Sequence, residues 1–439
     1  MPFPPPAQKG MTQLNREVFK RVISVYGVRI PATKVMSFQK QIRGDLFNQP
    51  KLKNVVDDND SKETRLVLLR SDVQSADLEN VSDESKKVIE TEGLGIAKHT
   101  IELTYDYWTS DEILRAIIPE ELPEVPSAFT AVGHIAHMNL REEYLPWKKV
   151  IGQVILDKNK TIKTVVNKLD AIDTTFRFFK MEILAGDDNM IAEVKESGCR
   201  FRFDFSQVYW NSRLHTEHDR LIKQFAKNDY VCDIFAGVGP FALPAAKKGA
   251  NVYANDLNPV SYKWMVENIR LNKIKNNFRP YNMDGREFIK QAVNDLDQAL
   301  NTGDTWKTFD HFVMNLPATG LEFLDAFRGV YRTKKDVYEK SGSPKLPLVH
   351  CHCFSKSPTP NIDILERIQM ATGEPVDAES SYVHWVRKVA PNKDMYCVSF
   401  RLTPDIVFAE SSIKRKEPIL EGGGSAVETK KPKIDDKAQ

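Results

Sequence analysis

The spacing of apolar and polar residues changes about halfway along the chain. Residues 14–105 mix short apolar runs, RVISVYGVRI and RLVLLR, with a polar span. Further along, before residue 213, β-branched and aromatic alternation predicts strands at KKVIGQVILD, TIKTVVN, FRFFKMEILAG and RFRFDFSQVYW. The proline-rich segment 121–129, ELPEVPSAF, separates the first two runs from the others. This half of the sequence therefore predicts an α+β module over 1–120 and a β-rich module over 125–212.

From residue 213 onward, short apolar runs of strand type alternate with longer amphipathic runs. The predicted strands are YVCDIFA, NVYANDL, HFVMNLP, PLVHCHCF and MYCVSFRL. The helices predicted between them are FALPAAKKG, VSYKWMVENIRLNK, EFIKQAVNDLDQAL, GLEFLDAFRGVY and NIDILERIQMA. This alternation predicts an α/β fold of the Rossmann-like class over 213–408, with a doubly wound, mainly parallel sheet. The polar residues 409–439 contain too few apolar groups to fold and are expected to form a disordered basic tail.

Composition and charge limit the possible functions. The chain has 439 residues, of which 41% are hydrophobic, so it can bury a large core. It has no apolar run of about 18 residues, and its first residues, MPFPPPAQKG, lack the apolar stretch of a secretory signal. We therefore expect neither a membrane segment nor secretion. With 62 basic and 60 acidic residues the formal net charge is +2, so any nucleic-acid-binding surface has to be local.

The cysteine pattern indicates free thiols and no metal site. There are five cysteines, an odd number, and most lie in apolar, strand-like runs. The tract Cys351-His352-Cys353 has the residue types of a metal site. In a strand, however, its C-x-C spacing places both sulfurs on one face, and no second ligand pair has the spacing of a zinc site.

The sequence suggests cytoplasm and nucleus as compartments, and the mitochondrial matrix as a further one. The basic clusters at 414–416 and 430–433 are typical of nuclear-import signals or of a solubilising tail. Basic residues near the start suit mitochondrial import, although Glu17 and the proline-rich opening count against it; they are Arg16, Lys20, Arg21 and Arg29.

The stretch DIFAGVGPF, residues 233–241, predicts a ligand site. It combines the end of a strand, a turn with Gly237 and Gly239, and the start of a helix, which is where α/β sheets bind ligands. Asp256 lies 19 residues after Gly237, at the end of the next predicted strand, where a carboxylate can accept hydrogen bonds from a ribose diol. The pair indicates a cofactor that contains adenosine. The alternative is a structural turn with solvated acids.

The cofactor indicated by this turn is S-adenosylmethionine. Ala242 replaces the third glycine of the dinucleotide fingerprint, which weakens the case for a pyrophosphate. S-adenosylmethionine has no phosphate and suits a turn with two glycines. Between the second and third of the predicted strands above, Asp284 and Gly285 of YNMDGREF close a further strand, the third of the sheet, where a carboxylate can accept from the adenine amino group.

The segment after the fourth predicted strand indicates the substrate. It reads Asn315-Leu316-Pro317-Ala318, at a place where nucleic-acid amino-methyltransferases carry an N-P-P-Y motif. The first proline and the tyrosine of that motif are absent here. We therefore expect the target to be another nitrogen, or a carbon, of an extruded base.

Four ordered motifs resemble one family. DIFAGVGPFALPAA, ANDLNP, MNLPA and the upstream VYWNSRLHTEHDR are similar to the eukaryotic and archaeal tRNA (guanine-37-N1)-methyltransferases, over residues 125–408. The resemblance implies a class I, S-adenosylmethionine-dependent methyltransferase that methylates N1 of the guanosine 3′ of the anticodon. Its implied partner is a tRNA with guanosine at position 37, and the protein is expected to be a monomer with its first 120 residues docking the tRNA.

The resemblance also implies roles for individual residues. Glu217 is the general base and Arg177 stabilises the charge on O6, while Asn315 and Pro317 belong to the catalytic motif. Without the resemblance, Glu217 reads as a solvated helix residue and Arg177 as a surface charge on a strand. The implied cofactor contacts are His215, Asp256, Leu257, Asp284, Gly285 and Asn315. His215 can equally be a surface histidine, and Arg213 can serve a phosphate or an ion pair.

Two other functions fit parts of this pattern. An aminocarboxypropyl transferase of the wybutosine pathway has the same fold and cofactor and acts on the same tRNA nucleoside, but it transfers a different part of the cofactor. A noncatalytic tRNA-binding protein would need a broken turn or base, and both are intact. NLPA and Glu217 favour methyl transfer.

Overall fold

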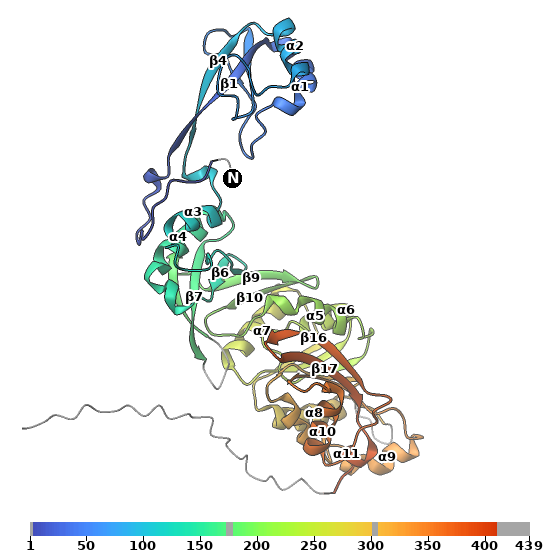
Figure 1. Cartoon of the computed structure of the whole chain (residues 1–439). Coiled ribbons are helices and arrows are strands. Elements are labelled where there is room, and N and C mark those ends of the chain that lie inside the picture. The colour runs from blue at the N-terminus through green and yellow to red at the C-terminus, as the bar shows by residue number, and fades with distance from the viewer. Residues whose placement is uncertain (1–2, 173–178, 301–305, 411–439) are drawn as a thin grey trace, which may run out of the picture. The chain divides into compact units, whose positions relative to one another are not determined.

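The chain consists of two compact units, which meet between His215 and Thr216. The computed structural model describes residues 3–172, 179–300 and 306–410 (Figure 1). We call the two parts the N-terminal unit and the C-terminal unit and describe each by itself. Among the described helices, none has both the length and the apolar character to cross a bilayer. The finer division into modules 1–120, 125–212, 213–408 and a tail stays a prediction.

The first half of the N-terminal unit is an antiparallel sheet with two helices. Its strand order is β2-β3-β1-β4. The strands are β1 (Arg21–Pro31), β2 (Val55–Asp57), β3 (Thr64–Leu68) and β4 (Ile96–Leu103), and the helices are α1 (Val35–Gln41) and α2 (Asp83–Glu92). One face of β1 packs with both helices in a core that includes Val28, Phe38 and Ile89. The apolar runs RVISVYGVRI and RLVLLR lie largely in β1 and β3.

The second half of this unit holds a second four-stranded sheet, β5-β6-β7-β8, and a hairpin, β9-β10. Its elements are α3 (Ser110–Ile117), β5 (Thr130–Val132), β6 (Ile135–Met138), α4 (Lys148–Lys158), β7 (Thr164–Ile172), β8 (Phe179–Gly186), β9 (Ile191–Glu196) and β10 (Cys199–Asp204). One core contains Phe19 and Trp108 together with Ile151 and Leu184. Residues from both predicted modules therefore share a hydrophobic core.

The prediction of a strand at KKVIGQVILD is wrong, because these residues form the helix α4. The buried residues of α4 include Val150, Ile151, Val154 and Ile155. Successive members of this set are one, three and one residues apart, which places them on one face of a helix despite their β-branched side chains. At Gly152, an added Cβ would lie 2.5 Å from the Cβ of Leu184, so the glycine lets α4 approach β8 closely.

The C-terminal unit confirms the predicted doubly wound sheet. Its strand order is β13-β12-β11-β14-β15-β17-β16. The strands are β11 (Tyr230–Asp233), β12 (Asn251–Asn255), β13 (Phe278–Tyr281), β14 (His311–Met314), β15 (Leu348–Ser355), β16 (Tyr382–Ala390) and β17 (Lys393–Arg401). Strands β11 to β15 are parallel, whereas β17 runs antiparallel to both β15 and β16. The chain moves outward from β11 to β13 and then returns to β14 on the other side of β11, which creates a switch point there.

The helices of this unit are α5 (His215–Ile222), α6 (Ala242–Lys248), α7 (Pro259–Leu271), α8 (Gly285–Leu300), α9 (Lys335–Lys340), α10 (Pro360–Thr372) and α11 (Pro404–Val407). The predicted helix GLEFLDAFRGVY is a 3-10 helix, η7 (Gly320–Phe327). The edge strand β16 was not predicted, since SYVHWVRKV lacks regular alternation; its pairing with β17 shows two register shifts.

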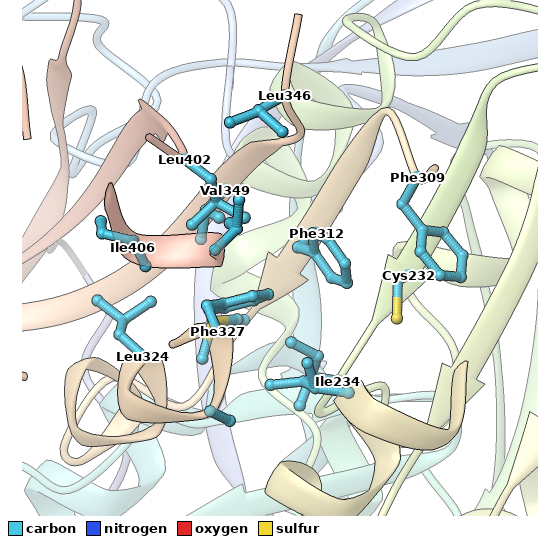
Figure 2. Packing of buried hydrophobic residues seen from close by; sticks show 14 of the residues in the cluster. Cys232, Ile234, Phe309, Phe312, Leu324, Phe327, Leu346, Val349, Leu402 and Ile406 are labelled. Atoms are coloured by element: carbon cyan, nitrogen blue, oxygen red, sulfur yellow. The ribbon is translucent and has the colours of Figure 1, made fainter. Parts of the chain in front are cut away.

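The core of the C-terminal unit fixes the strand ends that carry the predicted site. Figure 2 shows Phe312 of β14 within this core, with Phe327 on one side and Cys232 on the other. The rings of Phe312 and Phe327 are 4.8 Å apart and edge to face. Because Asp233 pairs in register with Val313, the segments that follow β11 and β14 leave the same edge of the sheet.

Candidate active site

The turn after β11 has the backbone that its two glycines predict. Gly237 has φ +57° and Gly239 has φ +97°, both in the left-handed region. An added Cβ at Gly239 would lie 1.9 Å from Cδ1 of Leu243, the end of a flexible side chain, so the left-handed backbone is the main reason for glycine here. At Gly237 an added Cβ would meet nothing within 4 Å. The space beside Gly237 is therefore open to a ligand.

Asp256, which follows β12, holds this turn in place. Its carboxylate accepts hydrogen bonds from the backbone N–H of Gly237 at 2.8 Å and of Asn258 at 2.9 Å. Burial nevertheless raises the pKa of Asp256 to about 6, because these bonds only partly offset desolvation. The next residue, Leu257, is 49% exposed, and Asn282 binds its carbonyl oxygen.

Asp233, the last residue of β11, lies completely buried next to this turn. Its carboxyl oxygens make no hydrogen bond of ordinary geometry with the described residues, although the backbone N–H of Phe235 lies near enough to favour the charged form. Burial, together with the charge of Asp256, raises the pKa of Asp233 well above its ordinary value. A buried carboxyl group without a hydrogen bond of ordinary geometry marks a place where a positively charged or hydrogen-bond-donating ligand would be stabilised.

Asp284 and Gly285 stand where the third parallel strand is followed by α8. Asp284 Oδ1 accepts from the backbone N–H of Arg286 at 2.9 Å, which caps the helix. An added Cβ at Gly285 would lie 2.9 Å from the ring of Phe235, so the glycine lets the loop after β11 pack against α8. Asp284 therefore lies close to the glycine turn.

Asn255 is a positioning residue that the sequence analysis missed. It is fully buried at the end of β12, and its amide donates to the carbonyl oxygens of Ile234 and Met283 at 3.2 Å and 3.0 Å. Its own oxygen accepts from Met283 N–H at 2.9 Å. It thus ties together the loops that follow β11 and β13. The signal in the sequence was a polar residue at the apolar end of NVYAN.

Asn315 and Pro317 follow β14 at the same edge of the sheet. The amide oxygen of Asn315 is buried and has no hydrogen-bond partner among the described residues. The Pro317 carbonyl accepts from Phe354 N–H at 3.0 Å, which anchors this segment to β15. The arrangement leaves an acceptor without a partner at the end of the strand.

Glu217 is buried, so its interpretation as a solvated helix residue is wrong. Its side chain is 3% exposed. Arg220 binds both carboxylate oxygens at 2.7 Å, and His352 Nε2 lies 2.8 Å from Oε1. His384 Nε2 is 3.7 Å from Oε2. We call Glu217, Arg220, His352, His384 and Cys397 the Glu217 cluster.

The partners of Glu217 keep it charged. Burial alone would favour the neutral carboxyl group, but the hydrogen bonds from Arg220 and His352 outweigh it and lower the pKa of Glu217 to about 2. Burial likewise opposes a charge on His352, yet Cys397 and Glu217 raise the pKa of His352 to about 9. At neutral pH this is a buried network of one carboxylate and two cations.

The Glu217 cluster also contains a possible metal-ligand triad. The ligand atoms of Glu217, His352 and Cys397 lie within 4.8 Å of one another. Because the guanidinium of Arg220 already occupies both carboxylate oxygens, a second cation would be repelled, and we assign no metal here. Cys351 and Cys353 lie in the hydrophobic core on the opposite face of β15, as their alternation predicts.

The remaining predicted residues fall outside the C-terminal unit or outside the described residues. His215 lies at the end of the N-terminal unit and is exposed, with Nδ1 3.1 Å from the carbonyl oxygen of Ser212. Arg213 is also exposed, and its backbone N–H donates to Asn211. Arg177 lies outside the described residues. The roles of His215, Arg213 and Arg177 stay predictions.

Comparison with known proteins identifies related sequences along nearly the whole chain. The TRM5/TYW2 methyltransferase domain family matches residues 192–338, and the TYW2 N-terminal domain family matches residues 110–189. A tRNA (guanine(37)-N(1))-methyltransferase of Batrachochytrium dendrobatidis is 48% identical, over 95% of this chain and 94% of the relative. One of Danio rerio is 44% identical, over 92% of this chain and 84% of the relative.

Two solved structures share the fold. The crystal structure of Trm5b from Pyrococcus abyssi is 22% identical with a TM-score of 0.55, and it covers 86% of this chain and 99% of its own. The complex of aTrm5 with tRNALeu is 20% identical with a TM-score of 0.62, at the same two coverages.

Proposed function

This chain belongs to the tRNA (guanine(37)-N(1))-methyltransferases of the TRM5/TYW2 family, and we propose that it methylates N1 of guanosine 37 in tRNA. The observation that carries this proposal is the 48% identity to a curated relative over 95% of the chain. The geometry of the C-terminal unit supports it, since the glycine turn, the acidic loop ends and Asn315 all lie at one edge of the parallel sheet.

The residues at this edge fit S-adenosylmethionine. Gly237 leaves open space, Asp256 and Asp284 offer carboxylates at the ends of the second and third strands, and Asp233 is a buried acid without a hydrogen bond of ordinary geometry. S-adenosylmethionine carries positive charges on its sulfur and its amino group and has no phosphate, so nearby carboxylates stabilise it and disfavour a pyrophosphate. Once bound, it supplies an electrophilic methyl group.

The target base would be held and activated by the chain's own residues. Asn315 offers a buried amide oxygen that can accept from a guanine N–H. The N1 of guanine carries a proton at neutral pH, so its lone pair becomes available to a methyl group only as that proton passes to a carboxylate and negative charge collects on O6. We assign the proton to Glu217 and the stabilisation of O6 to Arg177.

The structure adds a condition to the role of Glu217. A carboxylate that is 3% exposed and bound by Arg220 and His352 is a weak base, and its pKa of about 2 reflects that. Proton transfer therefore requires Glu217 to leave these partners. Substrate binding would supply the free energy for this rearrangement.

A transfer assay with nucleoside analysis tests the function. Purified protein is incubated with methyl-labelled S-adenosylmethionine and unmodified tRNA transcripts that carry guanosine or adenosine at position 37. We expect label only in the guanosine transcript, as 1-methylguanosine. An aminocarboxypropyl adduct would establish the wybutosine-type reaction instead, and binding without any adduct would establish a noncatalytic tRNA-binding protein.

Three further assignments belong to the same proposal. The first 120 residues dock the tRNA, the protein acts as a monomer, and it works in the cytoplasm and nucleus, with the mitochondrial matrix as a further compartment. The basic clusters at 414–416 and 430–433 lie outside the described residues. Imaging of a tagged chain with and without residues 411–439 tests the nuclear assignment, since loss of the clusters should exclude the protein from the nucleus.

A further inference from the structure

The edge strand β16 displays aromatic side chains to solvent. Tyr382 is 60% exposed, Trp385 54% and Val389 45%. Among the large hydrophobic side chains that are exposed in the described part of the chain, three are aromatic, and two of these lie on β16; the third is Tyr209. Exposed aromatic side chains gathered on one strand indicate a binding surface rather than chance exposure.

The same segment is positively charged. Residues 382–393 contain Arg387, Lys388 and Lys393 and no acidic residue. Lys388 is exposed, and the Lys393 ammonium lies 4.3 Å from the centre of the Phe354 ring. Basic side chains beside exposed rings are the combination that binds single-stranded nucleic acid, because rings stack on bases and cations contact phosphates.

Protection of a sheet edge explains only part of this surface. β16 is the last strand of the seven-stranded sheet, and edge strands are protected by charges and bulges. The register shifts at Trp385/Arg387 and Lys388/Ala390 and the basic residues fit that role. Tyr382 and Trp385 do not fit that role, since exposed aromatic residues make an edge strand more prone to associate with other chains.

The surface also reaches the candidate base. His384 pairs in register with Cys397, and its Nε2 lies 3.7 Å from Glu217 Oε2. The Tyr382 ring stacks on the His384 ring, with centroids 6.0 Å apart. The alternation of a strand places Trp385 on the other face of the edge. A strand of nucleic acid that crosses the edge would meet both rings on its way to Glu217.

From these observations we propose that β16 binds single-stranded RNA next to the target guanosine, with bases stacked on Tyr382 and Trp385 and phosphates on Arg387 and Lys388. The inference rests on the proposed function, because the RNA segment in question is the anticodon loop around position 37. The rings would hold neighbouring bases while the target base is extruded toward Glu217.

Binding of an isolated anticodon stem-loop, measured by fluorescence anisotropy, tests the rings. Trp385→Ala and Tyr382→Ala should each weaken binding by about 5- to 100-fold, the range for one lost base stack. Ile362→Ala and Met370→Ala are matched controls, since these side chains are 57% and 70% exposed on α10 of the same unit, and they should bind like the parent. Trp385→Phe should restore most of the affinity.

The salt dependence of stem-loop binding tests the cations. Replacing Arg387 and Lys388 together by Gln should lower the slope of log affinity against log salt by about 1.4, at roughly 0.7 for each phosphate contact to a single strand. Lys290→Gln, an exposed lysine on α8, should leave the slope unchanged. Unfolding midpoints and S-adenosylmethionine affinity should match the parent in every variant.

Several results would overturn the inference. If both ring variants bind the stem-loop as tightly as the parent, or if the two α10 controls lose as much affinity, RNA does not bind at this edge. Parental affinity in the ring variants is also the result expected if β16 binds a protein partner. If the parent methylates guanosine 37 while the ring variants bind normally, only this inference fails. If the parent neither methylates nor binds tRNA, the proposed function fails with it.

Discussion

The glycine-turn edge and the Glu217 cluster of the C-terminal unit both contain buried acids, with opposite outcomes. At the glycine-turn edge, burial raises the pKa of Asp256 to about 6 and that of Asp233 well above its ordinary value. In the Glu217 cluster, hydrogen bonds from Arg220 and His352 overcome burial and lower the pKa of Glu217 to about 2. Similar desolvation thus yields either an acid that takes up a proton or a fixed carboxylate.

The difference lies in the neighbours. Asp256 is held by backbone N–H groups, and Asp233 makes no hydrogen bond of ordinary geometry with the described residues, so this edge has a deficit of positive charge that a cationic cofactor can fill. Glu217 already has a guanidinium and an imidazolium. The glycine-turn edge is therefore prepared for a ligand, whereas the Glu217 cluster has to be opened before it can do chemistry.

Replacement of Glu217 should have the largest effect. Glu217→Gln should lower the single-turnover rate of methyl transfer by about 10²–10⁴, the usual contribution of general base catalysis. It should also lower the free energy of unfolding by about 3 kcal/mol, because Arg220 and His352 keep their charges and lose their anion. Quench-flow and urea unfolding measure the two effects, with Glu366→Gln, an exposed acid on α10, as the matched control. A loss of stability with a parental rate would make Glu217 a purely structural residue.

Replacement of Asp256 should reduce the affinity for the cofactor more than it reduces the stability of the fold. Asp256→Ala should weaken S-adenosylmethionine binding by about 1.5–3 kcal/mol, because a charge-assisted hydrogen bond to the ribose is lost. Asp256→Asn keeps an acceptor for Gly237 N–H, so its affinity for S-adenosylmethionine should lie between those of Asp256→Ala and the parent. Titration calorimetry measures the affinity, and Asp336→Ala, an exposed acid on α9, is the control. Parental affinity in Asp256→Ala would place the ribose elsewhere.

The pH dependence of cofactor binding separates the two regions. Asp256 takes up a proton as the pH falls through about 6, so affinity should drop about tenfold between pH 7 and pH 5. Without cofactor the sign for folding is the reverse: the folded chain holds this proton more tightly, so stability falls as the pH rises from 3.8 toward about 6. Glu217 does not titrate between pH 5 and pH 7 in the folded chain, and its lowered pKa, about 2 against an ordinary 4.5, adds stability as the pH rises through that lower range. Asp256→Asn should flatten the affinity profile, and an unchanged profile would assign the titration to another group.

The two glycines of the turn should give the smallest effects and differ in kind. Gly239→Ala forces a Cβ against Leu243 and should reduce stability by about 1–3 kcal/mol. Gly237→Ala meets open space, so the left-handed backbone alone should lower stability by about 1 kcal/mol, while cofactor affinity falls further because the methyl group occupies the ligand's space. Urea unfolding and calorimetry on both variants distinguish the cases. If Gly237→Ala and Gly239→Ala reduce cofactor affinity equally, the space beside Gly237 is not the ligand site.

The sequence predicted the parts of the site that follow a strand and a turn. The positions of Gly237, Asp256 and Asn315 follow from strand order and backbone conformation, which local pattern encodes. The partners of Glu217 did not follow, because His352 lies 135 residues away and reaches it only through the packing of α5 on the sheet. The C-x-C spacing predicts the face of the two sulfurs, but nothing in the local pattern indicates that His352, on the other face of β15, contacts Glu217.

In the fold, too, the features set by neighbouring residues were predictable from the sequence, whereas those set by contacts between distant residues were not. The alternation of strands and helices after residue 213 predicted the parallel sheet, whereas α4 was mistaken for a strand because its β-branched residues outweighed a helical spacing. The core shared by Phe19, Trp108 and Ile151 joins segments on both sides of the proline-rich stretch at 121–129, which had suggested a boundary. A deletion of residues 1–120 would therefore cut through one core.

The buried cysteines can report how often each unit opens locally. All five cysteines are buried and form no disulfide in the described structure, with Cys199 in the N-terminal unit and Cys232, Cys351, Cys353 and Cys397 in the C-terminal unit. An alkylating reagent can reach them only when the surrounding unit loosens. The mass added to each peptide over time would then report two separate lifetimes, one from a single thiol and one from four, in a chain that carries no engineered label.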